Sequence, residues 1–235
     1  MRARDDFLSV ASHELKTPLT TLQLQFHLLL KDPGATAPMP LDRLRAKLEV
    51  ADRQVRRLSG LVESLLDVTR IRAGRLDIQL EDGVDLGGVA GEAASRLQLQ
   101  AERSRTPLDV RAAAGATGRW DRQRLDQVVS NLVSNALKYG AGKPVTVTVT
   151  ADDGRARLEV RDEGIGMSAE DQARIFERFE RAVADHDYAG LGLGLWITQQ
   201  IVHRLGGEIS VESAPGRGAA FVVDLPRAGP VGSEP

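Results

Sequence analysis

Residues 126–140 read DQVVSNLVSNALKYG, and their apolar side chains recur at the spacing of one face of a helix. This period predicts an amphipathic helix over 122–139 that packs against a core. Asn131 and Asn135 then lie one turn apart on one face, with Lys138 near the same edge. An amide oxygen is a suitable ligand for Mg²⁺, and a lysine suits phosphate. Taken alone, the pattern is as typical of a helix with two solvated asparagines.

A second motif, Asp162-Glu163-Gly164-Ile165-Gly166, follows a segment that alternates strictly between charged and apolar residues. The alternation predicts a half-buried strand over 155–162 in which Asp162 points inward with the apolar set. A buried carboxylate is costly without a donor, and the exocyclic amine of adenine is such a donor. Gly164 and Gly166 leave room for a planar ring against the backbone. The alternative is a surface turn, and the inward parity argues against it.

A glycine-rich loop, GLGLGL at 190–195, runs directly into the apolar pattern of another helix. Such a junction presents backbone N–H groups and the positive end of the helix dipole to an anion. Its spacing is neither that of a Walker A loop nor that of the dinucleotide fingerprint. The long irregular connection before it is typical of a lid, from which arginines can reach a phosphate. The candidate residues are Gly190, Gly192, Gly194 and Leu195 in the loop and Arg178 and Arg181 before it.

The N-terminal part predicts a helical hairpin. One apolar helical segment reaches residue 31, a Pro/Gly turn occupies 32–40, and a second helix follows. The second helix carries a heptad seam, and one hairpin with such a seam cannot close a core by itself. Two hairpins in a dimeric four-helix bundle can. The seam residues are Leu44, Leu48, Ala51, Val55, Leu58, Val62, Leu65 and Thr69.

His13 on the first of these helices stands in the run HELKT, which lacks the second histidine of a zinc motif. A neutral imidazole is a usable nucleophile near pH 7, and Glu14 beside it can take up its proton or fix its tautomer. Thr17 lies one turn later on the same face. The alternative is a structural helix histidine. With no cysteine and only four histidines in the chain, a metal cluster is not expected.

Together these motifs resemble the cytoplasmic kinase core of a two-component sensor histidine kinase, over about residues 4–225. FLSVASHELKTPLT resembles the family's phospho-acceptor box, SNLVSNALKYG its N box and DEGIGM its G1 box. IFERFER resembles the F box and GLGLGL the G2 box, and all five occur in the family's order. The segment HDYAG before the G2 box departs from the family's pattern and leaves the lid contacts open.

The resemblance implies ATP-dependent autophosphorylation of His13 with help from Glu14, and then transfer to an aspartate of a response regulator. It places Mg²⁺ on Asn135, the phosphates near Asn131 and Lys138, the nucleotide beside Tyr139, and the adenine amine on Asp162. Glu14 followed by Thr17 goes, in that family, with dephosphorylation of the partner regulator. The resemblance also implies a homodimer.

The expected fold class is α+β: a dimerisation and phospho-acceptor hairpin over 1–72, an α/β-sandwich ATP-binding domain over 73–227, and a disordered tail over 228–235. Strands are expected at 76–80, 108–110, 145–150, 155–162, 208–213 and 220–225, and helices at 84–103, 122–139 and 192–205.

Composition agrees with this reading. The net charge of −2 disfavours a nucleic-acid surface. The chain has neither an evident signal peptide nor a long apolar stretch, so we expect a cytoplasmic location, with membrane contact only through regions outside this chain. Two alternatives remain open at this point. One is a different ATPase of the same sandwich fold, such as a chaperone or a mismatch-repair type protein, and the other is a non-catalytic dimeric scaffold.

Overall fold

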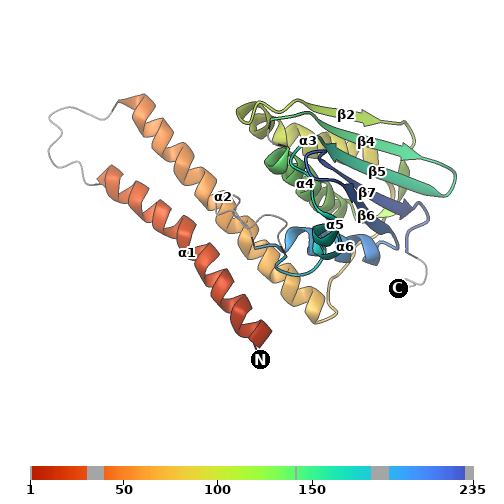
Figure 1. The fold of residues 1–235 in the computed structure, drawn as a ribbon, viewed down its shortest axis with the longest axis horizontal. Coiled ribbons are helices and arrows are strands. Elements are labelled where there is room, and N and C mark those ends of the chain that lie inside the picture. The colour runs from red at the N-terminus through yellow and green to blue at the C-terminus, as the bar shows by residue number, and fades with distance from the viewer. Residues whose placement is uncertain (1, 31–39, 141, 181–190, 231–235) are drawn as a thin grey trace. The chain divides into compact units, whose positions relative to one another are not determined.

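The computed structural model describes residues 2–30, 40–140, 142–180 and 191–230, without the side chains of residues 2–10 and His13. The chain divides into two compact units between Gly74 and Arg75 (Figure 1). This division falls two residues after the predicted domain boundary at residue 72. Within the described ranges, every helix is too short or too polar to cross a membrane.

The first unit is the predicted helical hairpin. Helix α1 spans Arg2–Leu30 and helix α2 spans Leu41–Arg72. Helix α1 continues through Pro18, which has no N–H to donate. Two threonine hydroxyls add hydrogen bonds in the following turn: Thr20 Oγ1 donates to the carbonyl oxygen of Lys16 at 2.9 Å, and Thr21 Oγ1 donates to that of Thr17 at 3.1 Å.

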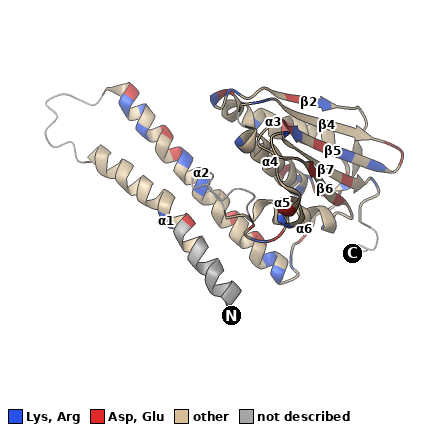
Figure 2. Ribbon diagram, in the orientation of Figure 1, with Lys and Arg blue, Asp and Glu red and all other residues tan. Residues whose placement is uncertain are grey.

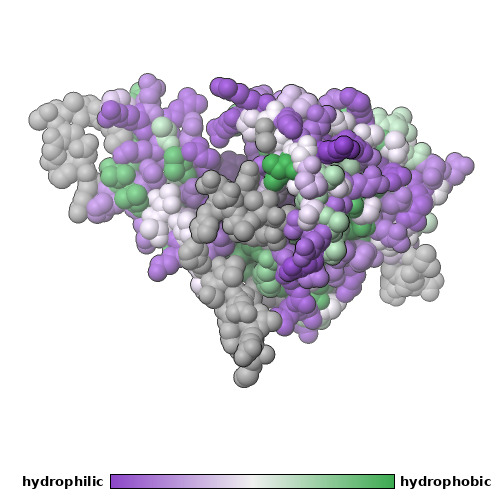
Figure 3. Space-filling model, viewed as in Figure 1, coloured by the Kyte–Doolittle hydropathy of each residue, from purple (hydrophilic) through white to green (hydrophobic). Residues whose placement is uncertain are grey.

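The predicted seam on α2 separates into two stripes. Ala51 is buried, and Leu44, Leu58 and Leu65 of the same heptad position are half-buried, next to the buried Leu61 and Val68. The other heptad position is open: the exposed fraction is 49% for Leu48, 51% for Val55 and 44% for Val62. Figure 3 shows hydrophobic side chains on the surface of the hairpin. A single hairpin therefore leaves half of the seam without a partner.

The second unit contains two sheets. The larger has five strands in the order β2-β4-β5-β7-β6, with β2 and β4 parallel and the other pairs antiparallel. Its strands are β2 (Leu108–Ala112), β4 (Val145–Ala151), β5 (Arg155–Asp162), β6 (Glu208–Ser213) and β7 (Ala219–Pro226). The smaller sheet pairs β1 (Glu81–Asp85) with β3 (Thr117–Trp120), and neither strand was predicted.

The strand predicted at 76–80 is wrong. These residues have no regular secondary structure, and β1 begins only at Glu81. The apolar alternation reflects burial without strand pairing, because Leu76 is buried and Ile78 is half-buried. A carboxylate takes the place of a neighbouring strand here: the Gln79 N–H donates to Asp121 Oδ2 at 2.8 Å.

Helices α3 (Leu86–Arg103), α4 (Arg122–Tyr139) and α6 (Gly194–Arg204) form a layer on one side of the larger sheet (Figure 1). The core lies between helices and sheet, because the inward residues of β5 and the apolar stripe of α4 are fully buried. The opposite side of β5 carries charged residues, visible in Figure 2. The fold is thus the predicted α/β sandwich.

The C-terminal segment is ordered further than predicted. The Trp120 indole N–H donates to the Pro226 carbonyl oxygen at 2.8 Å, and the Gly229 N–H donates to the same group at 3.1 Å. The Arg227 guanidinium donates to the carbonyl oxygens of Gly115, Thr117 and Asp152. The prediction of a disordered tail from residue 228 is therefore wrong for residues 228–230, and residues 231–235 lie outside the described part of the chain.

Candidate functional site

Helix α4 carries Asn131, Asn135, Lys138 and Tyr139 and has the predicted bounds. Asp121 caps its first turn by accepting from the Arg124 N–H at 2.9 Å, and its apolar stripe is buried. The two asparagines are half-buried on the other side. Lys138 Nζ lies 4.8 Å from the centroid of the Tyr139 ring, which is cation–π distance.

The glycine-rich loop meets α4 at Asn131. Asn131 Nδ2 donates to Thr198 Oγ1 at 2.8 Å, and Thr198 is buried in α6. A Cβ atom on Gly194, the first residue of α6, would lie 2.4 Å from Asn131 Oδ1. Glycine is therefore required at this position, because any side chain there would collide with the asparagine.

The first turn of α6 has no side-chain cap, and the anion site that the sequence predicts there stays a prediction. Leu193 precedes the helix and provides no side-chain cap. Backbone N–H groups of a first helical turn, here those of Gly194 and Leu195, have no acceptor within the helix. The dipole adds positive potential at the same end. Asn131 lies directly beside this turn, as the contact with Gly194 shows.

The other end of α4 meets the segment after β5. The Ile165 N–H donates to the Tyr139 carbonyl oxygen at 3.2 Å. A Cβ atom on Gly164 would lie 2.0 Å from that oxygen, and one on Gly166 would lie 1.9 Å from the Ala214 carbonyl oxygen. Gly166 also has a φ of +65°. Both glycines are therefore required by close backbone packing, whereas the sequence suggested room for a ring.

Asp162 points inward, as its parity predicted, and is only 5% exposed. Its carboxylate accepts a hydrogen bond from the Gly164 N–H at 2.8 Å, and the nearby backbone N–H of Ala219 also stabilises the charged form. Burial raises the pKa of the Asp162 carboxyl group above its ordinary value, and the two backbone donors oppose that rise. A carboxylate with this burial is suited to accept one further N–H from a ligand.

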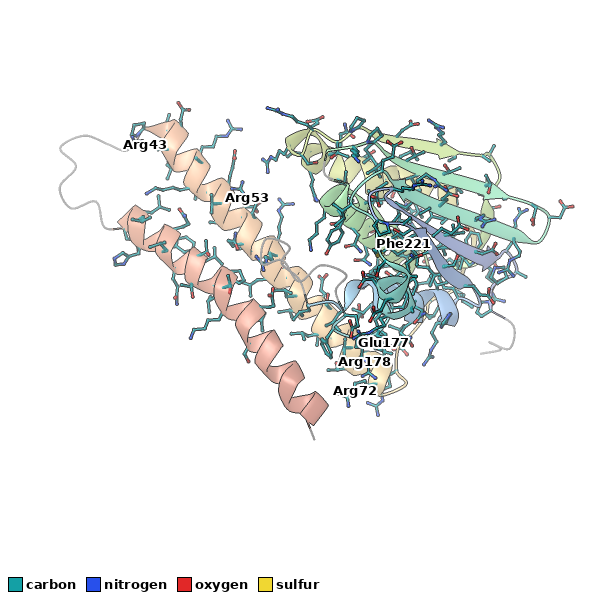
Figure 4. The ribbon with its side chains drawn as sticks, viewed as in Figure 1. Arg43, Arg53, Arg72, Glu177, Arg178 and Phe221 are labelled. Atoms are coloured by element: carbon teal, nitrogen blue, oxygen red, sulfur yellow. The ribbon has the colours of Figure 1, made fainter. Side chains whose placement is uncertain are left out.

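The segment before residues 181–190 is joined to the glycine-rich loop. The Phe179 N–H donates to the Gly192 carbonyl oxygen at 3.0 Å, and Phe179 has the unusual φ of +68°. The Arg178 guanidinium carbon lies 5.1 Å from the centroid of the Trp196 ring in α6 (Arg178 is labelled in Figure 4). Two predicted site residues, Arg181 and Gly190, lie outside the described residues.

In the first unit, His13, Glu14 and Thr17 all lie on α1, as predicted. The Glu14 carboxylate is bound by α2: Arg57 Nη2 donates to Glu14 Oε2 at 3.0 Å. This ion pair was not predicted. Thr17 is exposed, and its carbonyl oxygen accepts from the Thr21 hydroxyl.

The donor set can be tested against Mg²⁺, which prefers oxygen ligands and retains several waters or phosphate oxygens. Asn135 offers one amide oxygen as a ligand. It lies on α4 one helical turn after Asn131 and one turn before Tyr139. The described residues contain no cluster of three or more histidine, aspartate or glutamate side chains that could hold an ion by themselves. Asn135 supplies a single ligand, so Mg²⁺ bound there would need phosphate oxygens or waters as its other ligands.

Comparison with known proteins assigns both units. Residues 120–229 match the family described as histidine kinase-, DNA gyrase B-, and HSP90-like ATPase. That description leaves several classes of ATPase open. Residues 3–74 match the His Kinase A (phospho-acceptor) domain, which decides among them. The chain belongs to the histidine kinase family. A chaperone-type or mismatch-repair type ATPase, the first alternative from the sequence, is thereby excluded.

Individual histidine kinases agree with this assignment. AfsQ2 of Streptomyces coelicolor, a signal transduction histidine-protein kinase, is 37% identical over 232 residues, which are 94% of this chain and 41% of AfsQ2. Full-length ShkA, solved in complex with AMPPNP, superposes with a TM-score of 0.68 and 26% identity over 96% of this chain and 46% of ShkA.

The Acinetobacter baumannii histidine kinase AdeS shares the fold, with a TM-score of 0.68 at 23% identity over 92% of this chain and 98% of the AdeS chain. The chain thus spans a part of its curated relatives, including about two fifths of AfsQ2.

Sequence reasoning missed residues that hold the candidate site in place. Thr198 and Arg57 each bind a predicted site residue, and Ser213 and Gln172 bind the backbone of Met167 beside Gly166. Thr198 gave one usable signal, as a polar residue on the apolar face of α6. Arg57 and Ser213 lie far along the chain from the groups that they bind, whereas Gln172 is close to Met167, and nothing in the local sequence marks any of the three.

Proposed function

We propose that this chain catalyses ATP-dependent phosphorylation of His13 and passes the phosphoryl group to an aspartate of a response regulator. The observation that carries the proposal is the convergence on α4. The buried carboxylate segment meets the C-terminal end of α4 at Tyr139, and the first turn of α6 meets its middle at Asn131. An acceptor for a base and donors for an anion therefore lie along one helix, with Asn135 between them.

Asp162 is proposed to recognise the base. One of its acceptor positions is taken by the Gly164 N–H, and an ionised carboxylate has about four. The exocyclic amine of adenine supplies the further N–H that a buried carboxylate needs. Tyr139 is proposed to lie beside the nucleotide. The AMPPNP complex of ShkA supports an adenine nucleotide as the ligand, since AMPPNP is an analogue of ATP.

The phosphates are proposed to lie between Asn131, Lys138 and the first turn of α6, where the N–H groups of Gly194 and Leu195 are directed at an anion. Further contacts to the phosphates are proposed for four residues that precede α6 in the chain: Arg178, Arg181, Gly190 and Gly192. Asn135 would hold Mg²⁺, which when bound offsets charge on the transferring phosphoryl group. Positioning and electrostatics supply most of the catalysis in phosphoryl transfer.

In the proposed reaction a ring nitrogen of His13 forms a bond to the γ-phosphorus while the bond from that phosphorus to the ADP oxygen breaks. The N–H proton of the imidazole passes to Glu14, and ADP leaves. His13 lies on the first unit and the nucleotide is proposed to bind to the second, so the connection at Gly74 would have to let the γ-phosphate reach His13. Gly74 has a φ of +69°, a backbone conformation that glycine adopts without strain, and we propose it as the hinge.

The phosphoryl group then passes to the receiver domain of a response regulator docked on the hairpin, which we propose to be a homodimeric four-helix bundle. The open stripe of Leu48, Val55 and Val62 supports the dimer, because a second hairpin would cover it. Glu14 and Thr17 support a regulator phosphatase activity: the exposed threonine hydroxyl can hold a water but cannot replace the imidazole as a nucleophile.

Incubation with γ-labelled ATP tests the proposal. We expect acid-labile, base-stable label on the wild-type chain and none on His13→Gln, with the affinity for ATP unchanged in the variant. His27→Gln on the same helix is the matched control and should label like the wild type. Label that persists in His13→Gln contradicts the assignment of His13, and an unlabelled wild type favours the non-catalytic scaffold.

A further inference from the structure

Strand β6 lies at an edge of the larger sheet, and at its last residue a side chain takes the place of a neighbouring strand. Gln172 Nε2 donates to the Ser213 carbonyl oxygen at 2.9 Å, and the Ser213 N–H donates to Gln172 Oε1 at 3.1 Å. The same Nε2 donates to the Ser168 carbonyl oxygen at 3.2 Å. Only a carboxamide offers both a donor and an acceptor in this geometry, so glutamate cannot replace glutamine.

The Ser213 hydroxyl joins two further segments. It accepts from the Met167 N–H at 2.8 Å, at the end of the segment that follows Asp162. It donates to the Gly218 carbonyl oxygen at 2.6 Å, in the turn between β6 and β7. We call the side chains of Gln172 and Ser213, with these hydrogen bonds, the 172–213 clasp.

The two segments joined by the clasp are the two that hold Asp162. One supplies the Gly164 N–H, which donates to the carboxylate, and the other supplies the backbone of Ala219, whose N–H stabilises the charged carboxylate. Gly218 lies directly against the backbone of Asp162, since a Cβ atom on it would be 2.0 Å from the Asp162 carbonyl oxygen. A change in the spacing of the two segments would therefore move the donors that orient the carboxylate.

We infer that Gln172 and Ser213 are positioning residues for adenine recognition, which act by fixing the two backbone segments that orient the Asp162 carboxylate. The inference rests on the proposed function, because it takes Asp162 to be the acceptor of the adenine amine. Under this inference, the preference for adenine over a purine without the exocyclic amine depends on side chains that do not touch the base. The clasp also begins on α5 (Ala169–Arg174), so adenine recognition is coupled to the position of that helix.

The test compares ATP with purine riboside triphosphate, which differs by the absence of the exocyclic amine. Titration calorimetry on the full chain gives the affinity for each. We expect the wild type to prefer ATP by about tenfold to a hundredfold, the worth of one well-placed hydrogen bond to a charged group. Ser213→Ala and Gln172→Glu should reduce that preference about three- to tenfold while the affinity for purine riboside triphosphate stays within about twofold.

Ser210→Ala is the matched control, because Ser210 is an exposed serine on the same strand, and it should leave the preference unchanged. Ser213→Thr keeps the hydroxyl and should restore the preference. If Gln172→Glu fails to fold, as judged by tryptophan fluorescence, Gln172→Ala replaces it. An equal loss of affinity for both nucleotides, or an unchanged preference in the clasp variants, overturns the inference. A wild type without any preference overturns the role of Asp162 itself.

Discussion

Gly194→Ala tests the contact on which the phosphate end of the site depends. The new Cβ atom would lie 2.4 Å from Asn131 Oδ1, which is about 1 Å closer than an ordinary contact between such atoms. The amide must move, and the movement breaks its hydrogen bond to the buried Thr198 hydroxyl. A buried hydroxyl left without its partner costs about 1–3 kcal/mol, and the better helix propensity of alanine returns at most about 1 kcal/mol. We therefore expect a net loss of about 1–2 kcal/mol in the free energy of unfolding.

Urea unfolding followed by tryptophan fluorescence measures this loss. The signal reports on the second unit, which contains Gly194, because both tryptophans of the chain, Trp120 and Trp196, belong to that unit. Gly91→Ala is the matched control. Gly91 lies within α3, and a Cβ atom there would meet nothing within 4 Å. The control should gain about 0.5–1 kcal/mol from helix propensity alone.

A double-mutant cycle with Asn131→Ala isolates the collision from other effects. With the asparagine truncated, Gly194→Ala should cost almost nothing, because the atom that it strikes is gone. Equal destabilisation in both backgrounds would refute the reasoning, and so would a gain like that of Gly91→Ala in the wild-type background.

Four further outcomes follow from the structure. Burial raises the pKa of Asp162, so its carboxyl group favours the folded state below about pH 4 and loses that contribution as the pH rises through the raised pKa. The stability difference between wild type and Asp162→Asn should therefore fall as the pH rises above about 4 in urea titrations, and a flat difference contradicts the shift. Val62→Asp should give a monomer by light scattering with its helical circular dichroism intact, whereas Leu61→Asp, at a buried position, should lose helicity too. Thr17→Ala should keep His13 labelling and slow dephosphorylation of the regulator; equal dephosphorylation rates argue for a purely structural threonine. Arg57→Gln should lower the labelling rate severalfold at unchanged KM for ATP, and should add nothing to Glu14→Gln if Arg57 acts through Glu14.

Periodicity explains which elements could be predicted. Helix α4 and strand β5 have their predicted bounds, because each buries one face along its whole length and so carries an unbroken period of burial. The inward position of Asp162 follows from the same parity. Strands β1 and β3 escaped prediction because they are short, contain glycine and bury little more than one residue each. The segment 76–80 shows the converse error, since its alternation records burial but its backbone pairs with the side chain of Asp121.

The heptad seam on α2 shows a limit of a different kind. A heptad pattern gives the positions that are apolar, and it does not say which partner covers each of them. In the hairpin one heptad position faces inward while Leu48, Val55 and Val62 remain open. The same three side chains would be a solubility liability in an isolated hairpin, and their regular spacing is the strongest physical argument for a second copy.

The candidate site separates in the same way into groups that are proposed to meet a ligand and groups that hold them. Asn135 and Asp162 were found because their chemistry is unexpected for their places in a helix and a strand. Arg57, Thr198 and Ser213 were not, because each is an ordinary residue whose role depends on a contact with a distant part of the chain. These contacts nevertheless hold in a fixed orientation the side chains that are proposed to meet the ligand. A variant of the chain that keeps all five motif boxes but replaces Ser213 or Gln172 should therefore keep its resemblance to a histidine kinase and lose part of its discrimination for adenine.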